Sequence, residues 1–257
     1  MPVLAGDERR RLIDAYQEAT ESRLILLIDV FQSMTPWVLR QVLGAEPRVE
    51  RLHVLLASLG GYSSAAFECV RIVREGCKEL TVIIPGWAKS CAPLFALGAD
   101  RLIFGPTGEL GPVDFMDVSN PLAPSVAIGD PTPNLRRALA FCPSRGSGEM
   151  ERLVDALRPS LVGVSDHGTR FGYADAVAAG LPAARLDTST AAGRVLDELW
   201  QGLGPFLLDP PVEVGIPMLR LLQDSQRAYE ATIQPGPCTG KVEWPASFSQ
   251  PLEHVFP

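Results

Sequence analysis

The sequence of 257 residues is poor in the side chains that most often bind metals, form disulfides or act as general bases. It contains three histidines and five cysteines, and no two cysteines form a C-x-x-C pair. Dispersed cysteines of this kind give no zinc-site spacing and fit a reducing compartment. We therefore expect no metal and no cofactor, and we interpret all five as small buried apolar residues, namely Cys69, Cys77, Cys91, Cys142 and Cys238.

Long hydrophobic runs are also missing. The apolar runs, such as Leu24 to Ile28 and Cys91 to Leu97, are far shorter than the ~18 residues that a membrane span needs. No basic region leads into an apolar core at the N-terminus. We expect a cytoplasmic protein without an integral membrane segment.

Blocks of like charge are absent as well. The net charge of −7 comes from dispersed carboxylates, and basic residues cluster only in short runs such as Arg9 to Arg11 and Arg136 to Arg137. A nucleic-acid-binding domain normally carries a basic patch or stripe. Nucleic acid is therefore not an expected partner.

The residues that are present favour one large α/β domain. With 46% hydrophobic residues, the chain is long enough to bury a substantial core. Leu24 to Val30 is nearly continuous apolar sequence, as in a strand covered by helices on both faces. A helix capped by Ser33 or Thr35 and ending at Gly44 separates it from a second strand, Leu52 to Ala57. This βαβ unit predicts a parallel sheet with right-handed crossovers.

Periodicity and turn residues predict the remaining elements. We assign residues 1–203 to the main domain and residues 204–257 to a proline-rich C-terminal extension that could wrap a neighbouring subunit. The predicted strand is Leu80 to Ile84, and the predicted helices are Asp7 to Glu21, Ser63 to Glu75, Cys91 to Leu97, Leu135 to Phe141, Glu149 to Leu157, Tyr173 to Ala179, Thr188 to Leu203 and Gln223 to Ala231.

Two turns at the ends of neighbouring strands suit acyl-transfer chemistry. Gly60 and Gly61 follow one strand, and a turn of that kind leaves backbone N–H groups pointing into the crevice at the carboxyl end of the sheet. Ser90 follows the next strand, with Ala88, Cys91 and other small residues around it. A nucleophilic serine needs such an exposed strand-to-helix turn, with a following N–H for the oxyanion. The alternatives are a plain tight turn for the glycines and a helix N-cap for the serine.

The words SLGGYSSAA and AKSCAPLFALGADRLIFGPTGELGPVD resemble the Clp protease and signal-peptide-peptidase (SppA) clan of serine peptidases. The group called serine dehydrogenase proteinases is the most similar, and the resemblance covers about residues 23–185. It implies a ClpP/crotonase-like spiral of ββα units with a parallel sheet. It also implies that Ser90 is the nucleophile and that the N–H groups of Gly61 and Cys91 form the oxyanion hole.

The base is not provided by the motif itself. SppA-type relatives use a lysine downstream of the serine, but no lysine lies between Ser90 and Lys241. The segment SDHGTRFGYADAVAAGL resembles an acidic turn of the clan, near which the serine dehydrogenase proteinase group has a His-Asp pair. His167 is our preferred base, with Asp114 or Asp166 as possible orienters of its ring. The alternative is that His167 is a loop residue.

The other two histidines are less suitable, because His53 begins a buried strand and His254 lies in the C-terminal tail. Three function classes remain open. The first is a serine peptidase that hydrolyses a peptide or protein substrate through a Ser90 acyl-enzyme. The second is a catalytically impaired peptide-binding or scaffold relative, and the third is a crotonase-type acyl-thioester enzyme. Because relatives in the clan assemble into rings, the resemblance implies a homo-oligomer.

Overall fold

The structure, a computed structural model, describes residues 6–44, 47–113, 130–162, 169–203 and 218–233. Its centre is a seven-stranded sheet in the order β10-β9-β1-β2-β3-β5-β8. Five strands are parallel: β1 (Arg23–Ile28), β2 (Val49–Ala57), β3 (Cys77–Ile84), β5 (Arg101–Phe104) and β8 (Ala183–Arg185). The predicted α/β class with a parallel sheet is confirmed.

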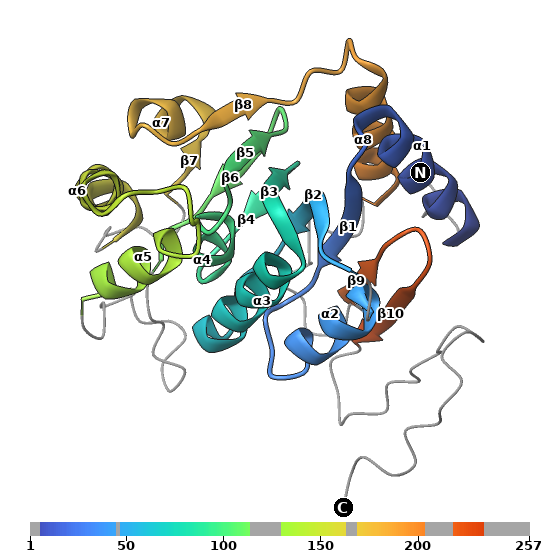
Figure 1. Cartoon of the computed structure of the whole chain (residues 1–257), viewed down its shortest axis with the longest axis horizontal. Helices are drawn as coiled ribbons and strands as arrows, with labels where there is room; N and C mark the ends of the chain where they lie inside the picture. The colour runs from blue at the N-terminus through green and yellow to red at the C-terminus, as the bar shows by residue number, and fades with distance from the viewer. Residues whose placement is uncertain (1–5, 45–46, 114–129, 163–168, 204–217, 234–257) are drawn as a thin grey trace, which may run out of the picture.

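Helices cover both faces of this sheet (Figure 1). The helices α2 (Thr35–Leu43) and α3 (Ser63–Glu75) pack on one face, and α1 (Gly6–Thr20) and α8 (Ala191–Leu203) lie side by side on the other. Alternate residues of β1 point to opposite faces of the sheet. Ile25 and Leu27 pack in the core under α2 and α3, and Leu24, Leu26 and Ile28 pack in the core under α1 and α8. This explains the continuous apolar run of β1, because both faces of the strand are buried.

A second, three-stranded sheet stands beside the carboxyl ends of the main strands. It consists of β4 (Trp87–Ala88), β6 (Glu109–Leu110) and β7 (Phe171–Gly172). Strand β3 leads into β4 and then α4 (Ala92–Ala96), and β5 leads into β6. The chain therefore repeats a step from the large sheet to the small one, as expected for ββα units. The remaining helices are α5 (Thr132–Leu139), α6 (Ser147–Leu161) and α7 (Tyr173–Ala178).

The predicted helix from Gln223 to Ala231 is wrong. The chain there forms an antiparallel hairpin of β9 (Met218–Gln223) and β10 (Ala228–Ile233), and β9 pairs with β1. Asp224 forms the turn, because its Oδ1 accepts hydrogen bonds from the backbone N–H groups of Gln226 (2.8 Å) and Arg227 (2.6 Å). Such a local side-chain bond competes with helix formation. The tertiary pairing with β1 then decides in favour of strand.

Three side-chain contacts fix the hairpin to the main sheet and its helices. The buried Arg9 of α1 donates to Gln223 Oε1 (2.8 Å), and Arg23 of β1 forms an ion pair with Asp224. Arg227 donates to the carbonyl of Val42 (3.1 Å). Its guanidinium lies so close to Gly44 that a Cβ there would be 2.2 Å from Nη1. Residues 218–233, which we assigned to the C-terminal extension, thus extend the main sheet.

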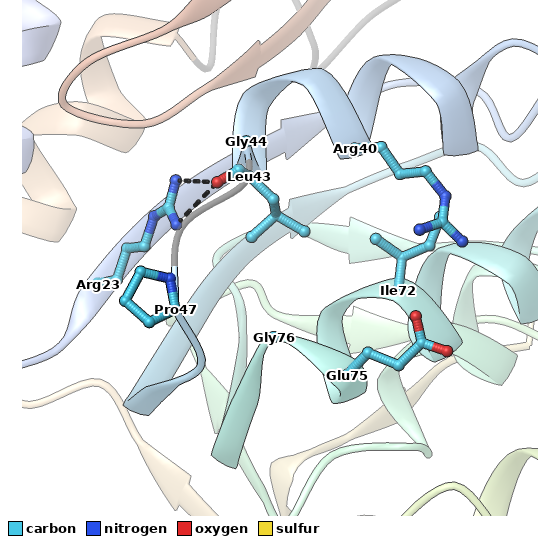
Figure 2. Close-up of a pocket in the computed structure, with 8 residues that line it drawn as sticks. All are labelled: Arg23, Arg40, Leu43, Gly44, Pro47, Ile72, Glu75 and Gly76. Carbon is cyan, nitrogen blue, oxygen red and sulfur yellow. Dashed lines mark hydrogen bonds between the residues drawn. The ribbon is translucent and has the colours of Figure 1, made fainter.

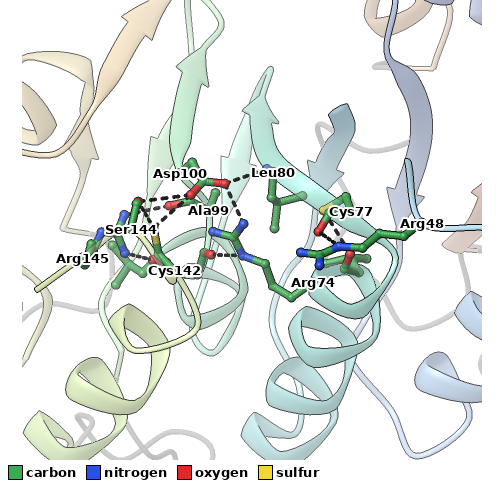
Figure 3. Close-up of polar contacts among 12 residues, drawn as sticks. Arg48, Arg74, Cys77, Leu80, Ala99, Asp100, Cys142, Ser144 and Arg145 are labelled. Carbon is green, nitrogen blue, oxygen red and sulfur yellow. Dashed lines mark hydrogen bonds and ion pairs between the residues drawn. The ribbon is translucent and has the colours of Figure 1, made fainter. Parts of the chain in front are cut away.

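Figure 3 shows a polar network at the amino-terminal side of β3 and β5. Asp100 accepts from Arg74 Nη1 (2.6 Å), the backbone N–H of Leu80 (2.7 Å) and the thiol of Cys142 (3.1 Å). Burial opposes ionisation of Asp100, but these donors prevail and lower its pKa to about 2. Beside this network, Arg145 holds the turn between α4 and β5 by donating to the carbonyl of Ala99 (2.7 Å).

Four of the five cysteines are buried, as predicted: Cys69, Cys77, Cys91 and Cys142. Cys238 lies outside the described residues. None of the described helices combines the length and apolarity needed to cross a lipid bilayer.

Candidate active site

The glycine turn after β2 and the serine turn after β3 lie against each other. Ser58 and Ala88 form a parallel bridge, in which Lys89 N–H donates to the carbonyl of Ser58 (2.9 Å). A Cβ built on Gly60 would be 2.5 Å from Ser90 Cβ and 3.0 Å from Ser90 Oγ. The juxtaposition inferred from the sequence is therefore present, and only a residue without a side chain fits at position 60.

Ser90 has a left-handed backbone conformation, with a φ of 53°. This conformation is uncommon for a residue with a Cβ and costs of order 1–3 kcal/mol, so the surrounding structure must hold it. Helix α4 begins at Ala92 with Cys91 as its N-cap, so Ser90 precedes the cap. The interpretation of Ser90 as a simple helix N-cap is wrong. Its half-buried side chain stands on a strained strand-to-helix turn, as an exposed nucleophile would.

Backbone donors lie on both sides of this serine. The N–H of Gly60 donates to Ser58 Oγ (3.1 Å) and is occupied. Within the described ranges, no acceptor binds the N–H of Gly61 or of Cys91. Gly61 is exposed and has a φ of 124°, and its Cα lies against Phe31, whose carbonyl oxygen would be 2.2 Å from an added Cβ. These are the two donors that the resemblance assigns to the oxyanion hole.

The thiol of Cys91 does not compete with Ser90 as a nucleophile. Cys91 is 2% exposed, and burial raises the pKa of its thiol to about 12. A thiol is a good nucleophile only as the thiolate. At neutral pH the Cys91 side chain therefore serves as a small apolar residue of the core.

An ion-pair cluster beside the serine could not be found from the sequence. Lys89 forms an ion pair with Glu109 of β6, and the other oxygen of that carboxylate is 3.1 Å from Arg170 Nε. The ammonium of Lys89 is thus bound to a carboxylate rather than to the adjacent Ser90. The only sequence signal was a lysine next to the serine, and its partner lies twenty residues later in a strand of two residues.

The three candidate acid–base residues, Asp114, Asp166 and His167, lie outside the described residues. The described residues just before Asp114 contact β4 and the end of α6. The N–H of Gly111 donates to the carbonyl of Ala88 (2.8 Å), and the N–H of Val113 donates to the carbonyl of Leu161 (2.7 Å). Ser90 Oγ forms no hydrogen bond with any described residue.

His53 lies in the middle of β2, away from the serine turn, and is half-buried rather than a core residue. Its Nδ1 is 2.7 Å from the hydroxyl of Tyr16 and 3.1 Å from Ser22 Oγ. Burial, with smaller contributions from the cations Arg51 and Arg101, lowers the pKa of His53 from 6.5 to about 4. The imidazole is therefore neutral in the folded protein at physiological pH. His254 lies outside the described residues.

The lowered pKa of His53 predicts a pH dependence of stability. Between pH 6.5 and about 4 the unfolded chain binds a proton that the folded protein does not. The free energy of unfolding should therefore fall as the pH is lowered through this range, by at most about 3 kcal/mol from this residue. Urea denaturation at several pH values would show this slope in the native protein and a weaker slope in His53→Gln. Parallel curves for the two proteins would contradict the assignment.

A pocket of about 230 Å³ opens at the amino-terminal edge of the sheet, away from Ser90. Figure 2 shows it between the end of α2 and the end of α3, with Arg23 pointing to the carbonyl of Leu43. Arg40 and Glu75 line its opposite side. The pocket is formed at the wrong end of the strands to serve the serine turn.

In the described part of the chain, no three His, Cys, Asp or Glu side chains gather in a group suited to a metal ion.

No protein-family model matches the sequence, and no curated protein is detectably similar to it. Several solved structures resemble it distantly, and two of them are as follows. A mutant of the membrane-bound, stomatin-specific protease 1510-N has 14% identity and a TM-score of 0.47, with 77% of this chain and 86% of that chain covered. A Pseudomonas malonate decarboxylase hetero-tetramer in complex with coenzyme A has 18% identity and a TM-score of 0.29, with 79% and 67% covered.

Proposed function

We propose that the protein is a serine-type peptidase that hydrolyses a peptide or protein substrate through an acyl-enzyme at Ser90. One observation carries the proposal. Ser90 has a left-handed backbone conformation and lies directly against Gly60, in a turn where the N–H groups of Gly61 and Cys91 bind no described acceptor. A strained serine between two available donors is the arrangement that acyl transfer requires.

In the proposed reaction, Ser90 Oγ attacks the carbonyl carbon of the scissile peptide bond and transfers its proton to a base. The carbonyl oxygen becomes an oxyanion, which the N–H groups of Gly61 and Cys91 stabilise. The C–N bond then breaks, and the leaving amine takes the proton from the base. Water hydrolyses the ester by the same steps. We assign the base to His167, with Asp114 or Asp166 orienting its ring, because of the resemblance to the serine dehydrogenase proteinase group.

The same resemblance supports the finer parts of the proposal. Membership of the Clp and SppA clan would explain the order of the glycine turn, the serine turn and the A-L-G-A-D helix end. It would also make the protein a homo-oligomer, and the sequence composition favours a cytoplasmic location.

A catalytically impaired, peptide-binding relative is the second candidate, and one observation favours it. The nearest lysine in sequence, Lys89, is bound to Glu109 and not to Ser90. Such a protein would keep the cleft and lose the chemistry.

The test is labelling with a fluorophosphonate probe, in which Ser90 Oγ forms a bond to phosphorus and fluoride leaves with the serine proton. The native protein should be labelled, and Ser90→Ala should lose labelling completely. Ser63→Ala is a suitable control for non-specific serine reactivity, because Ser63 is half-buried and lies at the start of α3, directly after the neighbouring turn. Labelling of Ser90→Ala at the native rate, or no labelling of the native protein, would reject the peptidase in favour of the second candidate.

A further inference from the structure

We propose that Glu109 is a positioning residue, which holds the nucleophile turn in its strained conformation by binding the side chain of Lys89. This inference rests on the proposed function, because the strained turn matters for activity only if Ser90 is the nucleophile. The juxtaposition that carries it is the ion pair between the residue before Ser90 and a carboxylate on the neighbouring strand of the small sheet.

The backbone alone restrains the residue before Ser90 at two atoms. Lys89 N–H donates to the carbonyl of Ser58 (2.9 Å), and its own carbonyl accepts from the N–H of Ala92 (2.9 Å). Ser90 itself appears in no backbone hydrogen bond with the described residues. A residue with a φ of 53° whose own N–H and carbonyl bind no described partner depends on the surrounding groups to keep that conformation.

The Lys89 side chain supplies a further restraint. Its stem lies flat on Gly111, where an added Cβ would be 2.6 Å from Lys89 Cδ and 3.2 Å from Lys89 Cα. The ammonium then reaches Glu109, and the two side chains are only 21% and 14% exposed. A charge-assisted bond that is this shielded from water is stronger than an ion pair on the open surface.

Glu109 is well placed to transmit this restraint across the small sheet. It pairs with Trp87 of β4 on one side and with Gly172 of β7 on the other. Its carboxylate binds one cation from each flank, Lys89 after β4 and Arg170 before β7. Arg170 is 79% exposed, so the pair with Lys89 is the stronger of the two.

Neither side chain contacts Ser90 Oγ among the contacts of the described residues, so the proposed role is positioning and not proton transfer. If Glu109 loses its charge, Lys89 keeps a partly buried cation without a counter-charge, and its stem should leave Gly111 for solvent. The turn would then relax from the conformation that presents Ser90.

The experiment compares the native protein with Glu109→Gln, Lys89→Met and the double variant. Amide hydrogen exchange of the segment 86–95 measures how firmly the turn is held, and it does so whether or not the protein is active. The rate of fluorophosphonate labelling is measured as a function of probe concentration. This gives two separate quantities, the maximal labelling rate and the probe concentration at which the rate is half-maximal. Glu151→Gln is the matched control, because Glu151 forms a bidentate pair with Arg136 (2.7 and 2.8 Å) on a distant part of the surface.

We expect Glu109→Gln and Lys89→Met each to speed exchange in the segment 86–95 and to lower the maximal labelling rate about tenfold. The half-saturating concentration should stay unchanged, because probe binding is not affected. The double variant should be no slower than the slower single variant, since both changes remove the same pair. Glu151→Gln should behave as the native protein does.

Exchange at the native rate in both single variants would overturn the positioning role, as would additive losses in the double variant. If Glu109→Gln does not fold, Lys89→Met still decides the matter, since it leaves Glu109 paired with Arg170. A native protein that is not labelled, together with faster exchange in the variants, would reject the proposed function while leaving the positioning role intact.

Discussion

Replacing Gly60 with alanine is expected to slow fluorophosphonate labelling of Ser90 by about 100-fold or more, the loss that follows a displacement of about 1 Å at a reacting group. The added Cβ would be 2.5 Å from Ser90 Cβ and 2.9 Å from the carbonyl oxygen of Lys89. Contacts this short require one turn to move. Gly60 also has a φ of 105°, which a residue with a side chain rarely adopts. The labelling rate and the denaturation midpoint should both be measured.

Gly148→Ala is the matched control for this substitution. Gly148 lies in α6, and nothing lies within 4 Å of an added Cβ there. Alanine should leave labelling unchanged and, because glycine disfavours helices, raise stability by up to about 1 kcal/mol. If Gly60→Ala were labelled as fast as the native protein, the two turns could not be in contact in the way described.

Asp224→Ala is expected to lower the free energy of unfolding by about 3–5 kcal/mol, as removal of one partner from a buried ion pair does. Asp224 is 1% exposed and its partner Arg23 has a side chain that is 12% exposed, so the change removes the carboxylate from a mostly buried cation. It also removes the acceptor for the N–H groups of Gln226 and Arg227. Urea denaturation followed by circular dichroism measures the loss.

Two variants separate the causes and control for the loss of charge. Asp224→Asn keeps an oxygen for the turn but removes the charge, so it should be less damaging than alanine. Glu151→Ala breaks the pair with Arg136, whose side chains are 49% and 45% exposed, and should cost less than about 1 kcal/mol. If Asp224→Ala and Glu151→Ala were equally stable, the hairpin could not be anchored to β1 by this pair.

The parts of the fold that depend on local pattern were predictable. The continuous apolar sequence of β1 showed burial on both faces, and the glycine at position 44 showed where α2 ends. The small sheet was not predictable, because strands of two residues such as Trp87–Ala88 carry no periodicity. The hairpin at residues 218–233 was missed for a different reason. A polar sequence suited to a helix is overridden there by pairing with β1 and by the Asp224 turn.

Some parts of the candidate site could also be predicted from the sequence, and others could not. The contact between Gly60 and Ser90 follows from the positions of two turns after adjacent parallel strands, which the sequence order reveals. The ion pair between Lys89 and Glu109 depends on how far β6 runs beside β4, and no local pattern records that distance. The assignment of His167, Asp114 and Asp166 stays a prediction, because these residues lie outside the described ranges.

The left-handed backbone at Ser90 has a consequence for selection on this protein. Glycine adopts such a φ without strain, and asparagine adopts it more readily than serine does. A lineage selected only for a more stable fold would be expected to exchange the serine for one of them. Stabilising changes at strained functional positions commonly remove the function. The serine at position 90 therefore gives up stability that glycine or asparagine would supply.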